Sequence, residues 1–193
     1  PSAGGDLDVA DVDDPDTFQA ATAGELAGTY GDFTFNELTG AWTYTLDDTL
    51  AATQELNALD AVSDSLTVTS FDGTDSETIT VNIAGANDAP TSTNDSETTL
   101  EDTAVVLGLD DFGTYADVDG DLIAAVKITT LESNGSLEYD STGGGVWVAV
   151  TLDQVISAAD IAAGRLRFVP DADGCGTSAT IGFKVGDGTL FSV

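Results

Sequence analysis

Residues 65–71 (SLTVTSF), 72–75 (DGTD) and 77–83 (ETITVNI) decide the fold class of this chain. In the two outer segments apolar residues alternate with Ser, Thr or Asn, which is the period of a β-strand with one buried face. The Asp-Gly pair between them is typical of a tight hairpin turn. The stretch therefore predicts an antiparallel β-hairpin that packs on a hydrophobic core.

The same short alternation, broken by Gly, Asp and Asn turns, runs along the whole chain and predicts an all-β protein. Residues 32–35 and 41–46 are predicted to form a further hairpin. Two Ala-rich stretches without β-branched runs, residues 49–59 and 157–163, predict short crossing helices. The strands predicted in the second half are residues 104–109, 124–130, 136–139, 146–150, 165–169 and 180–185.

Two repeated motifs predict a tandem of whole domains. Asp11-Val12-Asp13 recurs as Asp117-Val118-Asp119, an offset of 106 residues (117 − 11), and Asp72-Gly73-Thr74 recurs as Asp187-Gly188-Thr189, an offset of 115 (187 − 72). A period of about 110 residues fits a domain and not a small solenoid repeat. We expect one domain over residues 1–86, a linker at 87–90 (NDAP) and a second domain over 91–193.

The charge is extreme, with 35 acidic and 4 basic residues and a formal net charge of −31. Such a surface repels nucleic acids and anionic lipids, and no apolar run is long enough to span a membrane. It also repels itself, so that either bound calcium or a salt-adapted acidic surface without specific sites explains it. The chain has no His, and Cys175 is its only cysteine, which excludes the usual zinc sites and an internal disulfide.

One set of stretches runs through the first half and its end: 28–35 (GTYGDFTF), 40–47 (GAWTYTLD), 54–59 (QELNAL), 64–69 (DSLTVT) and 87–90 (NDAP). In these residues the first half resembles the VCBS repeat. A second set lies in the second half: 101–103 (EDT), 117–121 (DVDGD), 155–164 (VISAADIAAG) and 187–189 (DGT). In these residues the second half resembles the bacterial cadherin-like repeats of giant RTX adhesins.

This resemblance implies two tandem immunoglobulin-like Greek-key β-sandwiches with calcium at the domain junctions. It also implies secretion by a type I system and a place on the bacterial cell surface, in a protein that attaches cells to a surface or biofilm. Against the family pattern, we expect the first domain to lack its first strand and the second to stop before its last strand. The absence of an initiator Met before Pro1 predicts that the chain is a fragment of a longer protein.

Three carboxylates at alternate positions, Asp117, Asp119 and Asp121, are the strongest candidates for calcium ligands, because calcium takes several oxygen ligands. The motif is not an EF-hand, which requires Gly at its sixth and Glu at its twelfth position. If successive strands alternate in direction, the linker residues Asn87 and Asp88 reach this loop, with Asp187 nearby. These six residues are predicted to form one calcium site.

Other acidic residues are predicted at the outer ends of the two domains. Asp11, Asp13, Asp14 and Asp16 with Asp72 are expected to form the equivalent site of the first domain, and Glu101 and Asp102 are expected at the far end of the second. Asp72 and Asp187 also belong to Asp-Gly turns, and taken alone these turns favour a purely structural role for both residues.

The functional prediction is a calcium-stabilised spacer, a monomeric rod whose neighbouring repeats are held at a fixed angle by shared ions. A module that binds carbohydrate or another ligand is the alternative, and it requires exposed aromatic side chains. Trp42 and Trp147 alternate with small or polar residues, which favours core positions instead. An enzyme is not expected, because the chain has no His and no nucleophile motif.

Overall fold

The computed structural model describes residues 1–173 and 179–193, and within them the chain is an all-β protein with short helices. It divides into two compact units, Pro1–Ala86 and Asn87–Val193. Residues 87–90, predicted as a linker, belong to the second unit.

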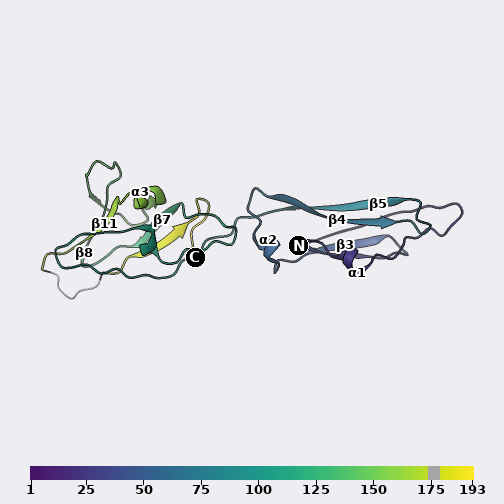
Figure 1. Cartoon of the computed structure of the whole chain (residues 1–193), viewed down its shortest axis with the longest axis horizontal. Coiled ribbons are helices and arrows are strands. Elements are labelled where there is room, and N and C mark those ends of the chain that lie inside the picture. Colours follow the sequence, from purple (N-terminus) through teal and green to yellow (C-terminus); the bar gives the residue numbers. More distant parts are fainter. Residues whose placement is uncertain (174–178) are drawn as a thin grey trace. The chain divides into compact units, whose positions relative to one another are not determined.

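The first unit is a sandwich of two antiparallel sheets with two single-turn helices (Figure 1). One sheet has the order β1-β3-β2, and the other is the hairpin β4-β5. The strands are β1 (Ser2–Asp6), β2 (Gly31–Phe35), β3 (Ala41–Leu46), β4 (Ala61–Thr69) and β5 (Ser76–Ala84), and the helices are α1 (Ala23–Leu26) and α2 (Ala51–Gln54).

The alternation that predicted the β4-β5 hairpin corresponds to the two faces of its sheet. In β4 the side chains of Leu66 and Val68 are buried, whereas Ser65 and Thr67 are exposed. Ile79 of β5 joins them, and the opposite sheet supplies its aromatic side chains to the same core. The core of the first unit consists of Phe18, Phe33, Tyr44, Leu66, Val68 and Ile79.

The second unit has two larger antiparallel sheets, with strand orders β10-β7-β12 and β6-β11-β8-β9. Its strands are β6 (Val105–Val106), β7 (Ala125–Thr130), β8 (Gly135–Tyr139), β9 (Val148–Ala149), β10 (Val155–Ser157), β11 (Leu166–Pro170) and β12 (Gly182–Gly186). The helical elements are the 3-10 turn η1 (Leu109–Phe112) and α3 (Ala158–Ala162).

Both sheets of the second unit contribute to one core. Fully buried side chains come from β7, β10 and β12 on one side and from β8 and β11 on the other. Helix α3 packs against β7, β10 and η1 and adds Ile161, and the side chain of Ser157 caps it by accepting from the Asp160 N–H. The largest fully buried side chains of this core are those of Ile128, Leu137, Ile156, Ile161 and Leu166.

Several elements differ from the predicted ones. Helix α2 is a single turn instead of the predicted eleven-residue span 49–59, because the N–H groups of Asn57 and Ala58 donate to side-chain oxygens, those of Asp60 and Asn57, where a longer helix needs them for carbonyls four residues earlier. The predicted strand 104–109 is reduced to β6 and is followed by η1. Strand β1 was not predicted, since its sequence SAGGD has no apolar alternation, and it forms by pairing with β3.

A buried carboxylate holds the two sheets of the first unit together. Asp64 of β4 accepts hydrogen bonds from the Tyr44 hydroxyl (2.7 Å) and from the N–H groups of Thr29 (2.8 Å) and Tyr30 (2.9 Å). Burial by itself raises the pKa of Asp64, but the donors together outweigh it and hold the pKa below its ordinary value. The charged form of Asp64 therefore stabilises the folded first unit.

Acid should therefore unfold the first unit, and Tyr44→Phe should weaken this dependence. A carboxylate with a lowered pKa stabilises the fold above the pKa of the unfolded chain, and this stabilisation is lost as the pH falls through the folded-state pKa. Removing the hydroxyl donor should cost about 1.5–3 kcal/mol at neutral pH, the usual range for a hydrogen bond to a charged group. Urea unfolding followed by Trp42 fluorescence, in a Trp147→Phe background, measures both effects.

Tyr30→Phe is the matched control, because its hydroxyl forms no hydrogen bond with Asp64 among the described residues. Equal losses of stability in the two variants at neutral pH would contradict the role given to the Tyr44 hydroxyl.

Candidate metal centres

Two groups of three carboxylates could each hold a metal ion, one in each unit. In the first unit the group is Asp11, Asp14 and Asp72, and in the second it is Asp117, Asp119 and Asp121. Within each group one oxygen of every residue lies within 4.8 Å of the others. Oxygen atoms converging in this way suit a hard divalent cation.

The group in the second unit is made by a tight turn of the backbone. The Asp119 N–H donates to Oδ1 of Asp117 (2.9 Å), and the Gly120 N–H donates to the carbonyl of Asp117 (3.3 Å). Gly120 has a φ of 79°, which a side chain would disfavour. This turn folds an Asp-x-Asp-Gly-Asp sequence back on itself, so that its carboxylates meet, whereas in an extended strand they would be spread along one face.

The residues at the start of the second unit are hydrogen-bonded to this group. Thr91 pairs with Ala116 through two backbone hydrogen bonds, which brings residues 87–90 beside the turn. The Asp88 N–H donates to Oδ2 of Asp119 (2.7 Å), and Nδ2 of Asn87 donates to Oδ2 of Asp187 (3.0 Å). The predicted residues of this site therefore converge at one end of the second unit, although Asp187 is linked to the others through Asn87.

The buried oxygen Oδ1 of Asp119 has no hydrogen-bond partner in the part of the chain that the structure describes. Buried carboxylate oxygens are normally paired, because leaving one unpaired costs free energy. This oxygen belongs to the carboxylate between Asp117 and Asp121 in sequence. A cation bound to the three residues would satisfy it.

Tyr115 reports the negative potential of this end of the unit. Burial, together with the negative charges of Asp117, Asp187 and Asp121, raises the pKa of its hydroxyl to about 12. Its hydroxyl lies 3.5 Å from Oδ2 of Asp117. The sequence analysis did not single out this residue, and its position two residues before Asp117 is the only signal for it.

Asp187 has a lowered pKa in spite of its surroundings. Burial alone raises it, but the Asn87 amide and the N–H groups of Leu190 and Thr189 donate to its carboxylate and more than offset this. Asp187 thus shapes its own Asp-Gly turn, as a structural role requires, and also holds Asn87.

The group in the first unit combines a loop with the β4-β5 hairpin. Oδ1 of Asp11 accepts from the N–H groups of Asp13 (2.9 Å) and Asp14 (3.0 Å), which curls this loop. The carboxylate of Asp72 accepts from the hydroxyls of Ser70 and Thr74. The bridge between Phe18 and Ser70 brings the loop and the hairpin turn together.

The remaining predicted residues lie outside the two groups. Asp13 contributes its backbone N–H, and its carboxylate is in neither group of the described residues. Asp102 accepts from the Asp173 N–H (3.2 Å) and has a φ of 59°, while Glu101 is exposed beside it. Cys175 lies outside the described residues.

The basic residues all belong to the second unit, where three of the four form ion pairs: Lys127 with Asp153, Arg165 with Asp160, and Arg167 with Glu138. Arg167 also stacks on the ring of Trp147, 4.0 Å from its centroid. The predicted core position of Trp147 is therefore wrong. One face of its ring is covered by Arg167 instead. Trp42 is half-buried and packs against the core of the first unit.

No family model matches this chain, and no curated protein sequence matches it significantly. Among the described residues, no helix is both long and apolar enough to cross a membrane.

Asp119→Asn should stabilise the second unit when metal is absent. The change removes one of three neighbouring negative charges and gives the buried position an amide that can donate to a neighbouring carboxylate. In the presence of a chelator we expect the free energy of unfolding to rise by about 0.5–1 kcal/mol, typical of one pair of partly exposed charges. Urea unfolding followed by Trp147 fluorescence, in a Trp42→Phe background, measures the change.

The matched control is Asp95→Asn, which removes the same charge from an exposed site outside both groups. If Asp119→Asn lowered the stability in chelator, or if Asp95→Asn raised it equally, the repulsion assigned to the three carboxylates would be refuted.

Proposed function

We propose that this chain is a calcium-binding spacer of a bacterial surface adhesin and has no catalytic role. The observation that carries the metal proposal is the buried, unpartnered Oδ1 of Asp119 within a group of three carboxylates. The adhesin context rests on the resemblance of the sequence to VCBS and bacterial cadherin-like repeats. The two parts of the proposal therefore need separate tests.

Calcium suits the ligand set better than the other common protein metals. The available donors are carboxylate and amide oxygens, since the chain has no His. Zinc and copper prefer nitrogen and sulfur ligands, whereas calcium and magnesium prefer oxygen. Calcium also accepts six to eight ligands in an irregular arrangement, which a turn with adjacent loops can supply, while magnesium requires a near-ideal octahedron.

Calcium bound to this group would act on the segment that joins the two units. The last residue of the first unit, Ala86, donates its N–H to the carbonyl of Leu56, and Asp88 of the second donates its N–H to Asp119. A cation held by Asp119 would fix the position of its carboxylate and so strengthen the hydrogen bond that this carboxylate accepts from the Asp88 N–H. Without it, repulsion among the carboxylates favours an open turn and a mobile connection.

This effect gives the proposed spacer its mechanical property. A connection with restricted motion keeps successive units extended, and an extended array holds whatever follows it away from the cell surface. Calcium sites of extracellular modules typically bind at about 10⁻⁴–10⁻³ M, so they are filled in calcium-rich medium and empty inside a cell. The unit would thus become stiff after export.

Calcium should raise the melting temperature of the chain, and Asp119→Asn should reduce this increase. A tenfold excess over the dissociation constant stabilises a folded unit by about 1.4 kcal/mol for each site. For a unit of this size that corresponds to roughly 5–10 °C. Differential scanning calorimetry with calcium, with an equal concentration of magnesium and with chelator measures the shift.

Asp95→Asn should keep the full response to calcium and serves as the control. An unchanged melting temperature on adding calcium to the unsubstituted chain would sink the metal proposal. Small-angle scattering on the same samples tests the spacer separately: the maximum dimension should be larger and better defined with calcium than with chelator. Calcium binding without this change would leave a metal site but refute the spacer.

A further inference from the structure

The hairpin β4-β5 leaves one long strand edge without a partner. β5 pairs only with β4 in the described part of the chain, and it is nine residues long. The outer side of β4 is partly covered, because the Gln19 N–H donates to the carbonyl of Thr69 and the Phe71 N–H donates to that of Thr17. The edge of β5 has no comparable cover.

The register of the hairpin identifies the groups that this edge presents. At one end the Ser70 N–H donates to the carbonyl of Asp75 (2.9 Å), and at the other the Gly85 N–H donates to that of Asp60 (2.9 Å). Both pairs fit the single register of the hairpin, so hydrogen-bonded pairs alternate between them. The intervening residues Thr78, Thr80 and Asn82 therefore turn their N–H and C=O groups away from β4.

Proteins normally protect such an edge with Lys, Pro, a bulge or a very short strand. β5 contains neither Lys nor Pro, its pairing with β4 has no register shift, and Glu77 is its single charged residue. Its sequence SETITVNIA is rich in residues that favour strands. The edge therefore remains able to accept another strand.

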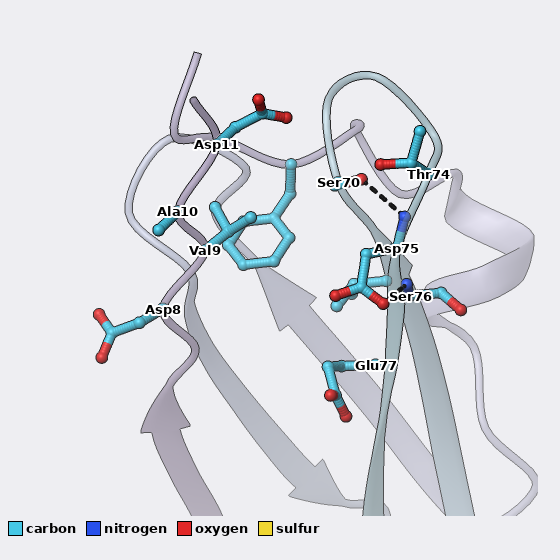
Figure 2. A pocket seen from close by; sticks show the side chains of 11 residues that line it. Asp8, Val9, Ala10, Asp11, Ser70, Thr74, Asp75, Ser76 and Glu77 are labelled. Atoms are coloured by element: carbon cyan, nitrogen blue, oxygen red, sulfur yellow. Dashed lines mark hydrogen bonds between the residues drawn. The ribbon is translucent and has the colours of Figure 1, made fainter. Parts of the chain in front are cut away.

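A groove of about 170 Å³ opens beside the first part of this edge. Figure 2 shows Asp8–Asp11 along one side and Asp75–Glu77 along the other, with the carboxylates of Asp75 and Glu77 directed into the space between them. Val9, Phe18 and Val68 also line the groove and give it apolar walls. The last two belong to the core of the first unit, so the groove reaches the interior of the sandwich.

We propose that the edge of β5 and this groove together bind an extended basic segment of another polypeptide by strand addition. The added strand would form main-chain hydrogen bonds with Thr78, Thr80 and Asn82. Because side chains of a strand alternate, every second one would face the groove. This inference does not depend on the metal proposal.

Charge decides the side chain that fits the groove. A Lys or Arg has an aliphatic stem for the apolar walls and a cationic head for the carboxylates of Asp75, Glu77 and Asp11. The first unit contains no Lys or Arg of its own, since all four basic residues lie in the second. A second copy of this unit would therefore bring only neutral or acidic side chains to the groove.

The probe for the test is a capped peptide of the same length as β5. Every second residue of this peptide is Thr, and the positions between are Lys or Val. We expect it to bind the full chain in isothermal titration calorimetry and to protect the backbone amides of Thr78, Thr80 and Asn82 from hydrogen exchange. A peptide with Glu in place of Lys should not bind. Binding is measured both in calcium and in chelator, and it should occur in both.

Two substitutions separate the main-chain and charge contributions. Thr80→Pro should abolish binding, because it removes an N–H from the free edge without removing a bond to β4, and the melting temperature should change little. Glu77→Gln should weaken binding by about two- to fivefold, as expected for one rim charge. The matched control, Glu55→Gln, removes an exposed charge of the same unit outside the groove and should leave affinity unchanged.

Four results would overturn the proposal. The first is an absence of binding by the Lys peptide, and the second is equal binding by the Glu peptide or by a folded Thr80→Pro variant. The third is binding that occurs in chelator but not in calcium, which would show that the peptide only neutralises the carboxylate groups that calcium otherwise fills. The fourth is a dimer of the chain alone that Thr80→Pro converts to a monomer, since the occupant of the edge would then be a second copy.

Discussion

Repulsion between carboxylates is the constraint on which the rest of this structure depends. Thirty-five acidic residues share a chain of 193 residues with four basic ones, and the fold does not simply spread them apart. It gathers six of them into two groups whose oxygens lie within 4.8 Å of one another. Backbone N–H groups compensate part of this repulsion: those of Asp13 and Asp14 donate to Asp11, and that of Asp88 donates to Asp119. What the N–H groups leave unbalanced would favour a bound cation at either group.

Hydrogen-bond donors also surround two buried carboxylates that belong to neither group. Asp64 is buried, and the Tyr44 hydroxyl and neighbouring backbone N–H groups surround its carboxylate. Asp140 in the second unit is likewise buried and accepts from Thr142 and Gly145. These satisfied carboxylates behave as structural hydrogen-bond acceptors. The contrast with Oδ1 of Asp119 distinguishes a carboxylate that completes a fold from one that needs a further partner.

The sequence predicted the strands best where alternation was strict and both faces of the strand differed. Residues 41–46, 65–71 and 77–83 fall within or beside β3, β4 and β5 for this reason. Strand β1 escaped prediction because Ser, Ala and Gly carry no such pattern, and only its pairing with β3 defines it. The predicted helix at 49–59 is shortened because the N–H groups of Asn57 and Ala58 donate to nearby side-chain oxygens instead of helical carbonyls. Pairing with a strand far along the chain, as in β1, leaves no local signal in a sequence.

The candidate site was predictable to the extent that it lies in one motif. Asp117, Asp119 and Asp121 are close in sequence, and Gly120 between the last two indicates a turn. By contrast, the carboxylate group of the first unit contains Asp14 and not Asp13. This difference depends on how the Asp11 carboxylate accepts from the N–H groups that follow it. Trp147 could not be assigned either, because its place under Arg167 depends on the pairing of β8 with β11 and on the ion pair with Glu138.

The placement of the basic residues has a further consequence for the resistance of the folded chain to proteases. Proteases of the trypsin type cleave only after Lys or Arg, and the first of these residues in the chain is Lys127. Lys127, Arg167 and Lys184 lie within β7, β11 and β12, and Arg165 immediately precedes β11 in an ion pair with Asp160. A protease must bind its substrate as an extended, accessible strand, which residues already paired in a sheet cannot provide. The folded chain therefore offers such enzymes no cleavage site in its first unit, and in its second only three sites within strands and one, at Arg165, directly before a strand.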